Sequence, residues 1–205
     1  MTVVGESWRQ QRSEEKRTSI LRAAQTLFVE EGYERSSVDA IAALAGVSKR
    51  TIYDHFGEKE LVYCAVVDRV SAALADAIRT AIDVDLPEAC DLRSGLLAFA
   101  RRVATETFSS SDYVLFRRLS SVRVPRQRIR GTVRNAPKEL FVERVARFVG
   151  AGALRPAEPW RVAEHFIALT FLLALDTLDP TVPTAWSELD EILVDGVDTF
   201  LRAYA

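Results

Sequence analysis

The chain has 205 residues, 48% of them hydrophobic, and a formal net charge of −2. This length supports one sizeable core and a small additional domain, while the near-zero net charge excludes an indiscriminate nucleic-acid binder, so any DNA binding has to come from a local patch. The two cysteines, Cys64 and Cys90, lack Cys-x-x-Cys spacing, which favours structural thiols over a redox sensor and indicates a reducing compartment.

The first thirty residues predict an arm followed by a helix. Residues 1–15 show no sustained apolar period, so we expect a flexible arm or a frayed extension there. From Lys16 to Glu31 the apolar residues follow a helical period, and Gly32 ends the helix. The beginning of the chain lacks the apolar core of a signal peptide, and no apolar run is long enough to span a bilayer, which predicts a cytoplasmic protein without membrane contact.

The next segment predicts two short helices joined by a sharp turn. Ser37 is a good N-cap for a helix over 38–45, and Gly46 supplies the left-handed conformation that ends it. Ser48 caps a second helix over 49–56, whose front end carries cationic, hydroxyl and aromatic side chains. This is the helix-turn-helix arrangement, in which the second helix enters the major groove of DNA.

The run Gly46-Val-Ser-Lys-Arg-Thr-Ile-Tyr-Asp-His-Phe-Gly-Glu-Lys-Glu-Leu61 resembles the signature of the TetR/AcrR family of bacterial transcriptional regulators. The resemblance implies a helix-turn-helix DNA-binding domain over 16–60 and a larger ligand-binding and dimerisation domain over 61–205. In that family a small molecule bound in the larger domain changes the spacing of two recognition helices, which implies a ligand-responsive repressor. For any single residue of the motif, an ordinary solvated hairpin is the alternative interpretation.

The exposed residues of the motif are candidates for DNA contacts. Hydroxyls and a cation near helix starts are expected to contact phosphates, namely Ser37, Ser48, Tyr53 and Lys59. Base reading falls mainly to Lys49, Arg50 and Thr51, since Lys and Arg donate to guanine and a Thr methyl can meet a thymine methyl. His55, on a partly exposed face of the same helix, completes the candidate set.

Downstream of the motif the apolar period stays helical, which predicts an all-α chain of about nine helices. The expected ranges are 58–82, 92–108, 113–124, 128–149 with a kink or break near its front, 158–178 and 184–204. The helix over 58–82 is expected to connect the two domains.

The last two predicted helices have the most apolar surface per turn. Residues 166–175 are hydrophobic nearly all round yet too few to span a membrane, so they have to be buried on more than one side. The core covers one face and a second copy the other, which predicts a two-fold homodimer through a four-helix interface, as the resemblance also implies. Two recognition helices related in this way read major grooves about 34–36 Å apart, so the operator is expected to be a palindrome.

Aromatic and scattered polar residues of the larger domain are candidates for the effector site that the resemblance implies. They are Phe99, Phe108, Tyr113, Phe116, Trp160, His165, Phe166, Thr170 and Asp176. For each aromatic residue, core packing is the alternative, and for His165 a satisfied or interface histidine is favoured. No ligand chemistry follows from this set.

Basic and acidic residues are segregated in the larger domain. The segment 113–138 contains Arg117, Arg118, Arg123, Arg126, Arg128, Arg130, Arg134 and Lys138 without an acid, while 162–201 contains acids without Lys or Arg. The two segments are expected to be solvated faces that compensate one another. The alternative is that part of the basic run contacts DNA or an anionic ligand such as an acyl-CoA.

Catalysis has almost no support in the sequence. There is no serine elbow, phosphate-binding Gly loop or metal-ligand cluster, and His55 and His165 fall in different predicted domains. We therefore expect no enzyme, no cofactor and no metal, and as partners double-stranded DNA, a second copy and a small-molecule effector. A ligand-independent regulator or activator is the main alternative, and a helical enzyme or cofactor-binding protein the more distant one.

Overall fold

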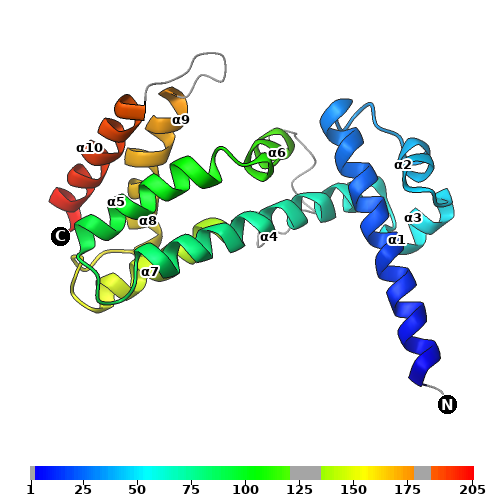
Figure 1. The fold of residues 1–205 in the computed structure, drawn as a ribbon, viewed down its shortest axis with the longest axis horizontal. Coiled ribbons are helices and arrows are strands. Elements are labelled where there is room, and N and C mark those ends of the chain that lie inside the picture. Colours follow the sequence, from blue (N-terminus) through cyan, green and yellow to red (C-terminus); the bar gives the residue numbers. More distant parts are fainter. Residues whose placement is uncertain (1–2, 121–134, 178–185) are drawn as a thin grey trace. The chain divides into compact units, whose positions relative to one another are not determined.

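The computed structural model describes the backbone of residues 3–120, 135–177 and 186–205 (Figure 1). Within these ranges the side chains at 3–7, 9, 120, 176 and 177 are not described. The described backbone is helical and contains no strand, and its continuous helical stretches number nine, which confirms the all-α prediction. No helix within the described ranges is both long and apolar enough to cross a membrane.

The helices follow the order that the sequence predicts. They are α1 (Val3–Glu30), α2 (Val38–Ala45), α3 (Lys49–Phe56), α4 (Lys59–Asp85), α5 (Leu92–Arg102), the π-turn η1 (Val103–Thr107), α6 (Ser111–Ser120), α7 (Ala136–Gly150), α8 (Pro159–Ile167), the π-turn η2 (Ala168–Leu172), α9 (Leu173–Thr177) and α10 (Trp186–Tyr204). The short helices α2 and α3 have the predicted bounds.

The structure differs from the sequence prediction at the first helix, and it does not describe part of the predicted basic segment. Helix α1 extends back to Val3, so residues 3–15 of the expected arm continue the helix that was expected to begin at Lys16. The front of the helix expected over 128–149 lies outside the described residues, as do five members of the basic run: Arg123, Arg126, Arg128, Arg130 and Arg134.

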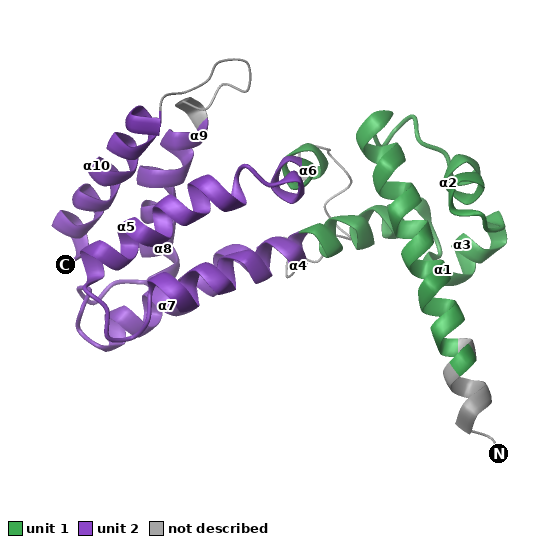
Figure 2. Cartoon of the chain, in the orientation of Figure 1, with its two compact units in different colours: residues 1–70, 115–133 green, residues 71–114, 134–205 purple. Residues whose placement is uncertain are grey.

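The contacts divide the chain into two compact units (Figure 2). Unit 1 comprises residues 1–70 and 115–133, and unit 2 comprises 71–114 and 134–205. The sequence-based division at 60/61 falls at the beginning of α4, whereas the contacts assign the front of α4 to unit 1.

Unit 1 is built around a small apolar core in which α1 packs against α2, α3 and the front of α4. Ile20, Ile41 and Ile52, one from each of α1, α2 and α3, are at most 1% exposed. The Ser19 hydroxyl donates to the Ala45 carbonyl at 2.9 Å, which ties α1 to the last residue of α2. This packing holds the exposed side of α3 in a fixed direction on a rigid support.

Unit 2 has a larger core that is rich in aromatic rings. Phe99 of α5 stacks on Phe141 of α7 with ring centroids 5.1 Å apart, and Phe166 of α8 meets Phe200 of α10 edge to face at 5.2 Å. All four side chains are at least 96% buried, so α5, α7, α8 and α10 share one core.

Two ion pairs join α10 to α5 at the surface of this core. Arg93 and Arg101 of α5 each bind an aspartate of α10 through two guanidinium nitrogens, with closest distances of 2.6 Å to Asp198 and 2.6 Å to Asp190. The hydrogen bonds from the guanidinium groups lower the pKa of both aspartates below the usual value. The same two acids belong to the acidic segment noted in the sequence, so in unit 2 they are compensated by α5.

Helix α10 and the π-turn η2 approach each other closely at Gly196. A Cβ atom at this position would lie 2.3 Å from the carbonyl oxygen of Leu169, a distance that real Cβ atoms do not adopt. Gly196 is therefore required by contact between two backbones and not by its own conformation.

Candidate nucleic-acid interface and ligand cavity

Helix α2 is held at both ends by local hydrogen bonds. The Ala40 amide donates to the Ser37 hydroxyl at 3.0 Å, and Gly46 adopts a left-handed conformation with φ of 67°. The Gly46 amide and the next one, of Val47, donate back to α2 carbonyls. These are the cap and the turn that the sequence predicted.

Helix α3 begins in the same way at Ser48. The Ser48 hydroxyl accepts from the Thr51 amide at 3.1 Å and also lies 2.8 Å from the Thr51 hydroxyl. Ile52 and Phe56 point into the core, which leaves Lys49, Arg50 and Tyr53 exposed. The front of α3 thus presents two cations and a phenol to the solvent, with the half-buried Thr51 beside them.

The two cations that are candidates for base reading each lie beside a carboxylate of unit 1. The Lys49 ammonium is 2.9 Å from the carboxylate of Asp39 at the front of α2, and this pairing raises the pKa of Lys49. The Arg50 guanidinium is 3.8 Å from Asp54 one turn along α3, and its side chain is 90% exposed. The local charge of the exposed side of α3 is therefore largely compensated within the helix-turn-helix itself.

The remaining candidates lie near the two helices but have mixed environments. Ser37 and Ser48 are exposed, so their hydroxyl groups can bond an outside acceptor as well as cap a helix. His55 is half-buried beside Phe56. The ammonium of Lys59 lies 4.3 Å from the centre of the Tyr33 ring, which positions it at the front of α4.

Unit 2 contains an apolar cavity of about 210 Å³. Its walls come from the helices and π-turns between α4 and α9, and the lining residues are Ile78, Phe99, Val103, Phe108, Tyr113, Pro137, Lys138, Phe141, Ile167, Phe171, Leu172 and Leu175. The Phe108 ring meets the Phe171 ring edge to face, with ring centroids 5.3 Å apart. Its centroid also lies 4.5 Å from that of Tyr113, whose ring is tilted against it. Aromatic side chains thus form much of the wall.

The structure brings only some of the predicted effector residues together at this cavity. Phe99, Phe108 and Tyr113 line it. Phe166 is fully buried in the core of unit 2, and so is Thr170, whose hydroxyl donates to the Phe166 carbonyl at 2.7 Å. The side chain of Asp176 is not described.

The other three predicted effector residues lie elsewhere. Phe116 packs against the core of unit 1. Trp160 lies under the ammonium of Lys138, which is 4.1 Å from the ring centre. His165 is exposed and shares a hydrogen bond with the Tyr204 hydroxyl, so it has a partner within unit 2.

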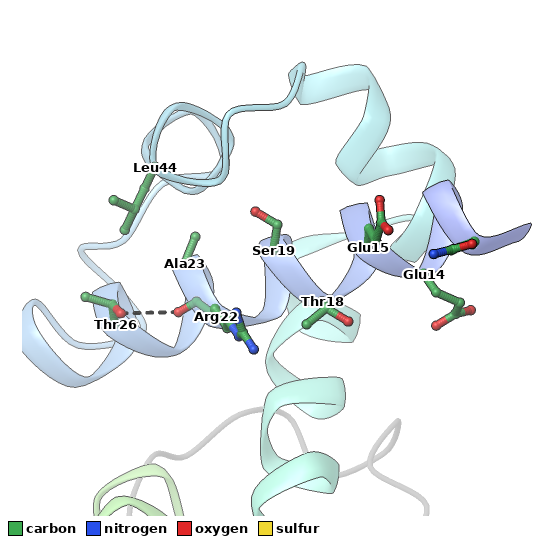
Figure 3. Close-up of a pocket in the computed structure, with 9 residues that line it drawn as sticks. Glu14, Glu15, Thr18, Ser19, Arg22, Ala23, Thr26 and Leu44 are labelled. Carbon is green, nitrogen blue, oxygen red and sulfur yellow. Dashed lines mark hydrogen bonds between the residues drawn. The ribbon is translucent and has the colours of Figure 1, made fainter. Parts of the chain in front are cut away.

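A second hollow lies beside α1 in unit 1 and differs in character (Figure 3). It has a volume of about 780 Å³ but is broadly open, and polar side chains such as Glu14, Glu15 and Arg22 line most of it. Small-molecule sites are usually concave and mainly apolar. The cavity of unit 2, which is lined almost entirely by apolar side chains, fits that description better and is the candidate ligand site.

Sequence reasoning missed several residues at both sites. Asp39 was not among the candidate residues, and its contact with Lys49 crosses from one helix to the next. Phe171 lines the cavity although it was not a candidate, and Lys138, which also lines it, was named only as a member of the basic run. Within the described residues no group of three or more His, Cys, Asp or Glu side chains could hold a metal ion.

Comparison with known proteins supports the helix-turn-helix interpretation. Residues 20–66 match the model of the bacterial regulatory proteins of the tetR family. Over 86 residues the chain is 37% identical to the HTH-type transcriptional activator FasR of Mycolicibacterium smegmatis, covering 42% of this chain and 39% of the relative. Over 81 residues it is 32% identical to the HTH-type transcriptional repressor NicS of Pseudomonas putida, covering 39% and 38%. The chain therefore matches about two-fifths of the length of these relatives.

The likeness to solved structures extends over nearly the whole fold. The flavonoid-responsive regulator FrrA superimposes with a TM-score of 0.70 at 26% identity, covering 92% of this chain and 96% of that one. All three of these proteins are named as regulators, and none of the three as an enzyme. Residues 20–66 therefore carry the helix-turn-helix domain of the tetR family of bacterial regulatory proteins, and the fold of the chain is similar to that of the regulator FrrA.

Proposed function

We propose that this protein is a sequence-specific DNA-binding transcriptional regulator whose α3 enters the major groove. The observation that carries the proposal is the exposed front of α3, where Lys49, Arg50 and Thr51 follow the Ser48 cap on a helix held from behind by a packed core. Lys and Arg donate to guanine, and a rigid support gives their side chains a defined register on the duplex.

Contacts to the DNA backbone are assigned to groups around α3. Ser37, Ser48 and Tyr53 offer exposed hydroxyls, and Lys59 offers a cation at the front of α4. Such contacts fix orientation but carry no sequence information. His55 is half-buried and is assigned a place at the edge of this interface.

The regulator acts as a homodimer on a palindromic operator. Leu172 of η2, Leu173 of α9 and Trp186 of α10 are large apolar side chains that are each more than half exposed. Exposed apolar side chains on neighbouring elements are typical of a surface that a second copy covers. A two-fold axis through such an interface would relate two copies of α3, which matches a palindrome with half-sites about 34–36 Å apart.

A small molecule bound in the cavity of unit 2 controls DNA binding. The apolar cavity supports this assignment, and the structurally similar FrrA is named as flavonoid-responsive. The requirement on the free energy is only that the effector binds one arrangement of the dimer better than the other.

We assign the protein the role of a repressor, as for NicS, which its name describes as one. FasR is named as an activator, so activation is the second candidate. A reporter gene placed behind the selected operator distinguishes them, because a repressor lowers transcription when the protein is expressed and an activator raises it.

The experiment that tests the proposal is selection of bound duplexes from a random DNA pool, followed by titration of the selected operator. We expect Arg50→Ala to lower operator affinity by about 1–3 kcal/mol per half-site and to relax the preference at one base pair. Lys59→Ala is expected to weaken all duplexes alike and to reduce the salt slope by about 1 per subunit.

The matched control is Arg161→Ala, which removes an exposed arginine of α8 in unit 2 and is expected to leave DNA binding unchanged. Failure to select any sequence, or unchanged affinity and preference after Arg50→Ala, would contradict the assignment of α3 as the reading helix.

A further inference from the structure

The cavity of unit 2 is shaped by two departures from regular helix. The π-turns η1 and η2 interrupt the helical stretches that begin with α5 and α8, and both border the cavity through Val103, Phe171 and Leu172. Phe108 follows directly after η1, where its amide donates to the Val103 carbonyl at 3.0 Å. Single π-turns inside helices occur frequently at functional sites. Two π-turns at one cavity therefore indicate a functional binding site and not a packing defect.

The size and the walls of the cavity limit the shape of a ligand. An engineered apolar cavity of about 150 Å³ holds one benzene molecule, so a volume of about 210 Å³ corresponds to a compact molecule of about one or two rings. The rings of Phe99, Phe108 and Phe171 border it, and aromatic rings prefer offset-stacked or edge-to-face neighbours. A flat aromatic ligand meets both conditions, whereas a long flexible chain would place only part of its length in this volume.

The charges at the cavity limit the chemistry of the ligand. Among the described residues that line the cavity, Lys138 is the one that carries a charge. Its ammonium, however, is directed at α8, where it lies 2.5 Å from the Glu164 carboxylate and 4.1 Å from the centre of the Trp160 ring. The hydrogen bond from Lys138 lowers the pKa of Glu164, so this acid stays ionised and keeps the lysine paired. The cavity therefore meets the alkyl stem of Lys138 and not its charge.

From these three observations we propose that the cavity binds an uncharged, flat aromatic molecule of one or two rings. The inference rests on the proposed ligand responsiveness and adds the class of ligand. An anionic ligand would have to displace Glu164 from Lys138 or lie unpaired against apolar side chains, and an unpaired charge taken out of water is strongly unfavourable. A neutral ligand leaves the ion pair between Lys138 and Glu164 intact, and its binding removes apolar surface from water.

The test uses the full-length protein and three probes: naphthalene, 2-naphthoate with the same rings and one carboxylate, and the fatty acid dodecanoate. Calorimetry and thermal unfolding measure binding to the protein without DNA. We expect naphthalene to bind and to raise the melting temperature, and 2-naphthoate and dodecanoate to bind at least about tenfold more weakly because of the charge. Stronger binding of either acid would overturn the proposal.

Variants locate the site and separate binding from loss of folding. Val103→Ala enlarges the cavity and is expected to shift the preference from naphthalene toward the three-ring phenanthrene. Val162→Ala is the matched control, since Val162 is equally buried in the same core but does not line the cavity. It lowers stability without changing the size preference. Lys138→Met is expected to leave naphthalene affinity within about twofold, because the charge is not used; a large loss would contradict the proposal.

Operator binding by the same samples keeps the two proposals distinguishable. If naphthalene binds but the selected operator is not released, the ligand class stands and effector control fails. If naphthalene does not bind while an acid both binds and releases DNA, effector control stands and the ligand class is wrong.

Discussion

At the level of single residues, the front of α3 is compensated by acids of its own domain. Asp39 is bound to Lys49 at 2.9 Å, so Lys49 has to leave a carboxylate before it can donate to DNA. A carboxylate beside the major groove also repels the phosphates of every sequence. The ion pair between Asp39 and Lys49 therefore weakens binding to non-specific DNA. It favours a duplex in which a base offers Lys49 a hydrogen-bond acceptor.

Removal of this acid gives a direct prediction. Asp39→Asn is expected to raise affinity for a scrambled duplex by several-fold and to lower the ratio between operator and scrambled affinities, measured by fluorescence anisotropy over a range of salt concentrations. The control is Asp76→Asn, which makes the same charge change on an exposed part of α4 in unit 2. A fall in affinity for both duplexes would mean that Asp39 serves DNA binding and does not oppose it.

Sequence reasoning is reliable for residues whose role is local. The caps at Ser37 and Ser48 and the turn at Gly46 depend on neighbours within a few positions, and the structure confirms all three. Contacts between helices are not visible in this way. Helical periodicity also places Phe99 and Phe166 alike on inward faces, yet only Phe99 borders the cavity.

At the level of helices, most boundaries could be predicted because caps, glycines and prolines mark them. The two π-turns could not, since nothing in Val103–Thr107 or Ala168–Leu172 differs from ordinary helix-forming sequence. A π-turn contains one residue more than a regular turn of α-helix, and this departure from α-helical hydrogen bonding is unfavourable. Tertiary packing has to offset its free-energy cost. At η2 that packing includes the backbone contact with Gly196.

The ion pairs between α5 and α10 predict how stability depends on pH. Asp190 and Asp198 have lowered pKa values in the folded protein, so their contribution is fully present above the ordinary aspartate pKa of about 4 and is lost as the pH falls through the folded values. We expect the double variant Asp190→Asn, Asp198→Asn to be slightly less stable at pH 7 and to lose less stability between pH 5 and 2.

Urea unfolding at each pH measures this difference, and Asp76→Asn again serves as the control, because it makes the same charge change at an exposed position of α4. The effect is small because both pairs are partly exposed to solvent. An unchanged slope with pH in the double variant would show that other carboxylates dominate the acid response.

At the level of the whole molecule, the exposed apolar side chains beside η2 and on α10 predict the oligomeric state. In a two-fold interface each substitution occurs twice, so the pair Leu173→Arg, Trp186→Arg places four charges in it and is expected to raise the dimer dissociation constant at least about 100-fold. Light scattering over a concentration series measures the constant. Val84→Arg, at another apolar side chain of unit 2 that is more than half exposed, is the control and should leave the dimer intact.

The contact at Gly196 has a mechanical consequence for this arrangement. Phe171 and Leu172 of η2 border the cavity, and two residues before Phe171 the Leu169 carbonyl meets the backbone of α10 with no side chain between them. Side chains in a core absorb small displacements by changing rotamer, but two backbones in contact have no such freedom. A molecule that pushes η2 outward would therefore move α10 by a similar amount. The two elements thus couple the cavity rigidly to the C-terminal helix.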